Sequence, residues 1–113
     1  MNKAIYQAPS AELYGDIRLE KGVSIWPKVV MRAESDHIEI GEYTNIQDFT
    51  MIHIANVPTK IGAYCSITHH CTIHGATIGD NCLIGINATP SWTGWSLATI
   101  ASSLDIPLLP RTP

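Results

Sequence analysis

The most constraining feature of this 113-residue sequence is a set of aliphatic residues that recur every six positions. They form the series Ile17, Val23, Val29; Ile40, Ile46, Ile52; Ile61, Ile67, Ile73; and Ile78, Ile84. A helix requires apolar spacings of three and four, and a half-buried strand requires alternation. A six-residue period fits neither, but it is typical of hexapeptide repeats, in which three hexads form one turn of a parallel β-helix. We therefore expect an all-β prism with these side chains inside and turns about 4.8 Å apart.

Two other columns of the repeat support this prediction. Glycine follows the aliphatic residue by one position at Gly41, Gly62, Gly79 and Gly85, and glycine permits the backbone conformations that a repeated tight corner needs. Small residues follow it by four positions, at Thr44, Thr50, Cys65, Cys71, Cys82 and Ala88. All three cysteines fall in this small-residue column. We therefore interpret them as packing residues rather than as metal ligands or nucleophiles.

The period is interrupted at three places and then ends. The spacing is 11 between Val29 and Ile40, 9 between Ile52 and Ile61, and 5 between Ile73 and Ile78. These departures predict small loops at residues 34–37 and 55–60 and a tightened corner at Gly75. The repeat stops after Ala88, so we expect about three and a half turns over residues 1–89, followed by an atypical tail over residues 90–113.

Composition excludes several classes of protein. Hydrophobic residues make up 45% and charged residues 15% of the chain, which argues against a disordered chain and against a coiled coil. The net charge of −3 predicts no nucleic-acid partner, and no apolar run is long enough to predict a membrane span. The first residues carry no secretory signal pattern, and three cysteines without a CxxC pair predict no disulfide framework. We expect a cytoplasmic protein.

The histidines occupy informative columns. His53 and His74 each follow a repeat isoleucine by one position, and their separation of 21 residues equals one 18-residue turn plus a three-residue loop. They should therefore lie one above the other, a spacing that suits two imidazoles on one ion. His69 belongs to a different side of the prism and can reach the ion of a neighbouring chain if three prisms pack around a threefold axis. The spacing thus predicts a three-histidine site shared between subunits, whereas His37 and His70 are interpreted as surface or packing residues.

Several stretches make the sequence similar to the γ-class carbonic anhydrase family. They are Gly15-Asp16-Ile17, Val23-Ser24-Ile25-Trp26-Pro27, Asn45-Ile46-Gln47-Asp48 followed by His53, His69-His70-Cys71-Thr72-Ile73-His74-Gly75, and the run from Ile78 to Gly85. The resemblance covers roughly residues 8–89, and its specific part is the pair Asn-x-Gln-Asp-x₄-His and His-x₄-His-Gly. It implies a left-handed prism. It also implies that His53 and His74 bind zinc from one subunit and His69 from the adjacent one.

The same resemblance implies roles for residues around the metal. Gln47 would orient the bound water or bicarbonate, with Asn45 close by. Arg32 and Asp48 match a pair that bridges subunits, and Glu34 stands where the family usually has the aspartate partner of the arginine. The implied activity is reversible hydration of CO₂ by a metal-bound hydroxide at the interface of a homotrimer, because zinc lowers the pKa of its bound water to around 7. Fe²⁺ and Co²⁺ are alternatives to zinc.

Two features of the sequence bear on whether this activity is present. The most active members of the family carry glutamates on an extended loop as a proton shuttle, whereas the loop at residues 55–60 contains no carboxylate. It resembles a shorter-loop branch in which activity is often weak or absent. After Ala88 the tail departs from the family, and codons permitted for Ser91–Pro107 allow a family-like continuation in a shifted reading frame. We therefore expect a truncation or frameshift after about residue 89, and a tail that forms a short helix over residues 97–104 or has no fixed structure.

Other functions remain open at the level of the sequence. A hexapeptide acyltransferase typically uses one histidine as general base at a subunit interface, with coenzyme A along the prism. A non-catalytic metal-binding or scaffold protein, or an inactive truncated product, is a third interpretation. Coenzyme A binding would favour the acyltransferase. Loss of zinc binding on substitution of His74, together with CO₂ hydration, would favour the carbonic anhydrase-like enzyme.

Overall fold

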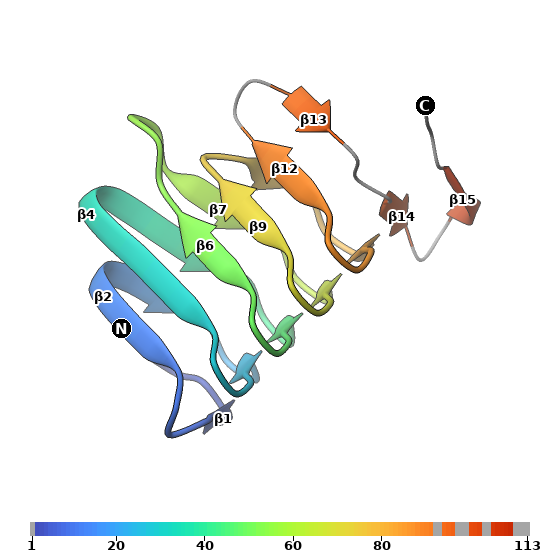
Figure 1. Cartoon of the computed structure of the whole chain (residues 1–113). Coiled ribbons are helices and arrows are strands. Elements are labelled where there is room, and N and C mark those ends of the chain that lie inside the picture. Colours follow the sequence, from blue (N-terminus) through green and yellow to red (C-terminus); the bar gives the residue numbers. More distant parts are fainter. Residues whose placement is uncertain (1, 92–93, 97–99, 103–104, 110–113) are drawn as a thin grey trace.

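The computed structural model describes residues 2–91, 94–96, 100–102 and 105–109, with side chains for residues 2–91. Within these residues the chain forms strands and no helix, and it winds in turns stacked along one axis (Figure 1). The strands of the stacked turns are β1 (Tyr6–Gln7), β2 (Glu12–Leu19), β3 (Ser24–Ile25), β4 (Val30–Ile40), β5 (Asn45–Ile46), β6 (Met51–His53), β7 (Thr59–Ile61), β8 (Ser66–Ile67), β9 (Thr72–His74), β10 (Thr77–Ile78), β11 (Cys82–Ile84) and β12 (Thr89–Ser91).

The turns have three faces, and the paired strands of each face within the turns run parallel. The first face is formed by β1, β3, β5, β8 and β11. The second is formed by the first halves of β2 and β4 with β6, β9 and β12. The third is formed by the second halves of β2 and β4 with β7 and β10. The predicted fold class, a hexapeptide-repeat parallel β-helix, is therefore confirmed.

The interior repeat position differs from the prediction in the first turn. Leu19 pairs with Ile40, and Ile25 pairs with Ile46, so the first series is Leu19, Ile25 and Met31 rather than one that begins at Ile17. These three side chains are fully buried, whereas Ile17 is only partly buried. Val23 and Val29 are buried too, but they occupy the column that later turns fill with threonine and cysteine. The first interruption is therefore nine residues, like the second, and both place a three-residue insertion at a corner.

The fourth turn is more complete than expected. Ser91 pairs with His74, which places the buried Pro90 at the repeat position after Ile84. The solenoid therefore has about four turns rather than three and a half. Paired residues are 18 apart at the start of the solenoid, as in Tyr6↔Ser24, 21 apart between the middle turns, as in Asn45↔Ser66, and 17 apart between the last two, as in Leu83↔Ser66. The predicted tight corner at Gly75 is present, with a φ of 67°.

The glycines after the repeat position serve a purpose other than the one predicted. Positive φ values at the stacked corners occur at other positions, among them the equivalent Gly22, Tyr43 and Tyr64. Gly41 and Gly62 do not have positive φ. They are required because the next turn passes so close that a Cβ at Gly41 would lie 2.5 Å from the carbonyl carbon of Gly62. Close approach of the backbones, rather than backbone conformation, explains Gly41 and Gly62, whereas a Cβ at Gly79 would meet no described atom within 4 Å.

The small-residue column packs as predicted. Cys65 and Cys71 are buried, Cys82 is partly buried, and all three are free thiols. The Sγ atoms of Cys65 and Cys71 each lie 3.1 Å from a carbonyl oxygen of the following turn, and Thr44 and Thr50 bond to the following turn in the same way. These side chains therefore tie each corner to the next one.

The described part of the tail extends the first and second faces with antiparallel strands. β13 (Gly94–Ser96) pairs with β12, β14 (Ile100–Ser102) pairs with β11, and β15 (Asp105–Leu109) pairs with β14. The helix expected over residues 97–104 falls mostly outside the described residues, and the part of it that is described is strand β14. The described residues form no helix that has the length and hydropathy of a membrane span.

Candidate functional site

His53 and His74 form a stacked pair on the second face. They end strands β6 and β9 and lie directly in register. Their ring centroids are 5.1 Å apart and the rings are 4° from parallel. The vertical stacking predicted from their separation in the sequence is therefore confirmed.

Thr59 holds the backbone beside this pair through hydrogen bonds. Its role was not predicted from the sequence. Its buried hydroxyl donates to the carbonyl oxygen of His53 at 2.7 Å and accepts from the amide of Gly75 at 2.8 Å. The Gly75 amide also lies 2.9 Å from the His53 carbonyl oxygen. Thr59 occupies an inward position that holds Ile38 one turn earlier. A polar residue at such an apolar position is the sequence signal that could have identified it.

The side chains of Arg32 and Glu34 both contact Nε2 of His53. Arg32 lies one turn before His53 in register, and Glu34 belongs to the three-residue insertion after Ala33. Glu34 Oε2 accepts from Arg32 Nε at 2.7 Å, and Glu34 Oε1 lies 2.9 Å from Nε2 of His53. The contact with His53 is the main reason that the pKa of the Glu34 carboxyl is below its usual range. Arg32, Glu34, His53 and His74 line one open cavity together with residues 54–56.

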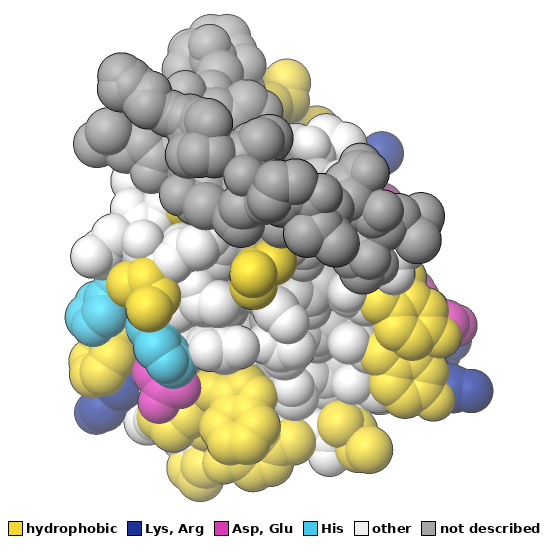
Figure 2. Space-filling model, turned by 90° about the vertical axis from the view of Figure 1, so that its right-hand side faces the viewer, with side chains coloured by type: hydrophobic (Ala, Val, Ile, Leu, Met, Phe, Trp, Pro, Cys, Tyr) yellow, Lys and Arg dark blue, Asp and Glu magenta, His cyan; other side chains and the backbone are white. Residues whose placement is uncertain are grey.

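A second group of polar residues lies at the first face. Gln47 Nε2 donates to Asn45 Oδ1 at 2.8 Å, and Asn45 Nδ2 donates to Ser66 Oγ at 3.0 Å. Asn45, Gln47 and Asp48 line a cavity of their own with Ser24 and Trp26. Asp48 Oδ1 lies 3.9 Å from Nδ1 of the half-exposed His69, which connects that histidine to this group. Figure 2 looks onto this side, where histidine and acidic side chains gather at one edge of a largely uncharged surface.

The predicted site residues therefore fall into two half-sites on one chain. The first holds Arg32, Glu34, His53 and His74, and the second holds Asn45, Gln47, Asp48 and His69. Across the residues that the structure describes, no three His, Cys, Asp or Glu side chains lie in a geometry ready to hold a metal ion. The stacked pair fits two of the ligands that a zinc ion would require, and a third must come from movement within the chain or from another chain.

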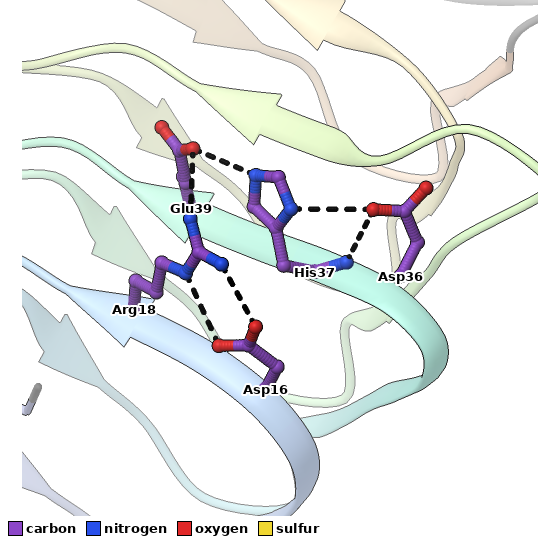
Figure 3. Close-up of polar contacts among 5 residues, drawn as sticks. All are labelled: Asp16, Arg18, Asp36, His37 and Glu39. Carbon is purple, nitrogen blue, oxygen red and sulfur yellow. Dashed lines mark hydrogen bonds and ion pairs between the residues drawn. The ribbon is translucent and has the colours of Figure 1, made fainter.

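The two remaining histidines have other surroundings. The ring of His70 stacks on Phe49, with centroids 4.9 Å apart. His37 lies on the third face, where its Nε2 is 2.7 Å from Glu39 and its Nδ1 is 3.2 Å from Asp36 (Figure 3). In the same cluster Arg18 pairs with Asp16 through two hydrogen bonds, which lower the pKa of the Asp16 carboxyl.

Comparisons with known proteins agree with the fold and with the family resemblance of the sequence. No protein-family model matches the chain. The gamma carbonic anhydrase 2 of Arabidopsis thaliana, a mitochondrial protein, is 38% identical in an alignment of 96 positions that covers 79% of this chain and 34% of that protein. A probable carbonic anhydrase of Methanocaldococcus jannaschii is 42% identical over 90 residues, which are 79% of this chain and 57% of that protein.

A solved structure is similar as well. The hexapeptide transferase family protein from Anaplasma phagocytophilum has a TM-score of 0.62 and 41% identity, over 66% of this chain and 43% of that chain. The fold and the stacked histidines define a hexapeptide-repeat β-helix protein with a candidate metal site. Together with the sequence relatives, they show that the chain belongs to the γ-carbonic anhydrase-like family of hexapeptide-repeat proteins. It spans between about a third and just over half of the length of these curated relatives.

Proposed function

We propose that the chain is a metal-dependent, carbonic anhydrase-like enzyme that hydrates CO₂ reversibly at the interfaces of a homotrimer in the cytoplasm. The observation that carries the proposal is the division of the predicted site into two half-sites on different faces. One chain offers the stacked His53 and His74, but its own His69 belongs to the other half-site. In a ring of three chains, the first half-site of each subunit would meet the second half-site of the next.

The metal would be held by His53 and His74 together with His69 of the partner subunit. Three nitrogen ligands and an open position are the arrangement of a catalytic zinc site. When bound, zinc supplies Lewis-acid activation of water near neutral pH, and Fe²⁺ or Co²⁺ can supply the same chemistry. The relatives named as carbonic anhydrases support this reaction for the family.

Gln47 and Asn45 would position the reactants. The bonds from Asn45 to Ser66 and from Gln47 to Asn45 fix the orientation of both amides. The Gln47 amide nitrogen is thereby turned toward Asn45, which leaves its Oε1 as the acceptor for a hydroxyl of water or bicarbonate. Arg32 and Asp48 would face each other across the subunit boundary, with Glu34 beside them.

The experiment is native mass spectrometry of the zinc-loaded chain, followed by a CO₂ hydration assay. The proposal predicts a trimer with about three zinc ions, and hydration activity above the buffer rate. Replacing His74 with alanine should weaken zinc binding by more than the roughly 10- to 100-fold that loss of an outer-shell partner costs. The matched control is His70→Ala, which removes an exposed imidazole that stacks on Phe49 and lines neither cavity, and it should leave binding unchanged. Equal zinc affinity in the two variants would contradict the proposal.

A second candidate is an acyltransferase, because the similar solved structure is named as a hexapeptide transferase family protein. This function requires a binding site for coenzyme A and one histidine as general base. Equilibrium dialysis with acetyl-coenzyme A distinguishes the two. Saturable binding that survives metal removal favours the transferase, and its absence favours the metal enzyme.

A further inference from the structure

A further cavity lies on the third face, beside the loop at residues 55–60. Its volume is about 510 Å³, which is within the range of pockets that hold small ligands. The cavity is lined by Val57, Pro58, Lys60, Gly75, Ala76, Thr77 and Ser91. No residue of the two half-sites lines it, so it is a separate place on the molecule.

Lys60 gives this cavity a single positive charge. It is the only charged residue in the lining, and its exposed side chain makes no ion pair or hydrogen bond within the described part of the chain. Thr77 is in register with Lys60 on the next turn and is also exposed, and its hydroxyl has no partner among the described residues. An ammonium group and a hydroxyl can both donate hydrogen bonds. Two neighbouring donors, one of them charged, are therefore open to an anion.

Glu39 does not neutralise this charge, although it is in register with Lys60 on the preceding turn. Its Oε2 lies 2.7 Å from Nε2 of His37 and 3.7 Å from Nη1 of Arg18 (Figure 3). The carboxylate of Glu39 thus has partners of its own on the earlier turns. The ammonium of Lys60 is left to an anion from solution.

The rest of the cavity favours a ligand with a hydrocarbon part. Val57, Pro58 and Ala76 supply apolar surface, and Val57 is 39% exposed. Covering such surface with an aliphatic chain is favourable, because both are removed from water. A single lysine matches an anion of one charge, whereas the second charge of a phosphate would have no partner in the lining.

We propose that this cavity binds a short-chain aliphatic carboxylate. Its carboxylate would accept hydrogen bonds from Lys60 and Thr77, and its hydrocarbon chain would lie against Val57, Pro58 and Ala76. The hydrogen bond from Lys60 is the stronger of the two, because it joins opposite charges. The site is independent of the metal, although residues 54–56 of the same loop line the cavity with His53 and His74.

The test is a titration of the full, ¹⁵N-labelled chain with sodium butyrate at constant ionic strength, followed by ¹H–¹⁵N correlation spectra. We expect saturable shifts of the amide signals of Val57, Lys60, Gly75, Ala76 and Thr77. Butyramide has the same shape without the charge, and it should bind at least about tenfold more weakly. Acetate lacks two methylene groups and should bind about fourfold or more weakly than butyrate.

Two variants assign the effect to the cavity. Lys60→Gln should reduce the affinity for butyrate at least about tenfold, and Thr77→Val should reduce it severalfold. The matched control is Lys28→Gln, because Lys28 is an exposed lysine that does not line this cavity. All three side chains are exposed, and the unshifted signals of the buried strands report whether each variant keeps its fold.

The proposal is overturned if butyrate causes no saturable shifts at these residues, or if butyramide binds as well as butyrate. It is also overturned if Lys60→Gln binds butyrate like Lys28→Gln. Tighter binding of inorganic phosphate than of butyrate at the same residues would contradict the assignment of the ligand as a carboxylate. Each of these results would leave the proposed function standing, because the cavity shares no residue with the two half-sites.

Discussion

Replacing Gly41 with alanine tests how tightly the turns are stacked. A Cβ at this position would lie 2.5 Å from the carbonyl carbon of Gly62 and 2.6 Å from the amide nitrogen of Ala63. Ordinary contacts of a Cβ are 3.4–4 Å, so the neighbouring turn would have to move by nearly an ångström. Both atoms belong to the backbone, and no rotation of a side chain can relieve the clash.

The magnitude follows from this geometry. Overpacking in a well-packed region costs about 1–3 kcal/mol, and a clash with backbone belongs at the upper end of that range. Gly79 supplies the matched control, because it holds the same column and a Cβ there meets no described atom within 4 Å. Its φ is not in the positive region, so Gly79→Ala should stabilise the chain by about 0.4–1 kcal/mol through the unfolded state.

Urea unfolding followed by circular dichroism measures both variants. The free energies of unfolding of Gly41→Ala and Gly79→Ala should differ by about 3–4 kcal/mol. Metal affinity should also fall in Gly41→Ala, because the spacing between turns sets the separation of the stacked histidines. Equal stabilities would refute the packing argument for this glycine column.

Three other predictions concern the corners and the site. Thr59→Val keeps the shape of the side chain but removes the hydroxyl from its two backbone partners, so the free energy of unfolding should fall by about 1–2 kcal/mol in urea titrations; an unchanged midpoint would contradict this role. The lowered pKa of Glu34 means that its contribution to stability is present above the ordinary carboxyl pKa and is lost as the pH falls through the folded value. Between about pH 6 and about pH 3 the unfolding midpoint should therefore drop more in the unaltered chain than in Glu34→Gln, and parallel curves would count against it. Cys82, which is partly exposed, should react with a thiol reagent in the folded chain, whereas the buried Cys65 and Cys71 should react only after urea unfolds it. Burial raises the pKa of all three thiols, so exposure makes the difference, and simultaneous labelling would argue against the packing described here.

Much of the architecture could be predicted because the six-residue period reports directly on the interior. The period predicted the wrong interior residues only in the first turn. There Val23 and Val29 are aliphatic at positions that later turns fill with threonine or cysteine. Both columns point inward, so spacing alone could not distinguish them. The pairing of Leu19 with Ile40 resolves the register.

The stacking of His53 and His74 was predictable because register depends only on the length of a turn. The contact between Glu34 and His53 was not, since it depends on the path of a three-residue insertion and on side-chain rotation. The polar Thr59 at an apolar position could have been noticed in the sequence, but the backbone partners of its hydroxyl could not, because they depend on how two neighbouring turns pack.

The measurement that tests the central claim most directly is complementation between two inactive chains. His69→Ala retains His53 and His74, and His74→Ala retains His69, so neither variant alone can form a complete shared site. In random mixed trimers each ring contains one boundary that unites the intact half-sites, so an equal mixture should recover about a quarter of the unaltered CO₂ hydration rate. Recovery of that rate, with neither variant active alone, is the result that the account predicts. A mixture as inactive as its components, alongside an active unaltered chain, would show that the site is not shared between subunits.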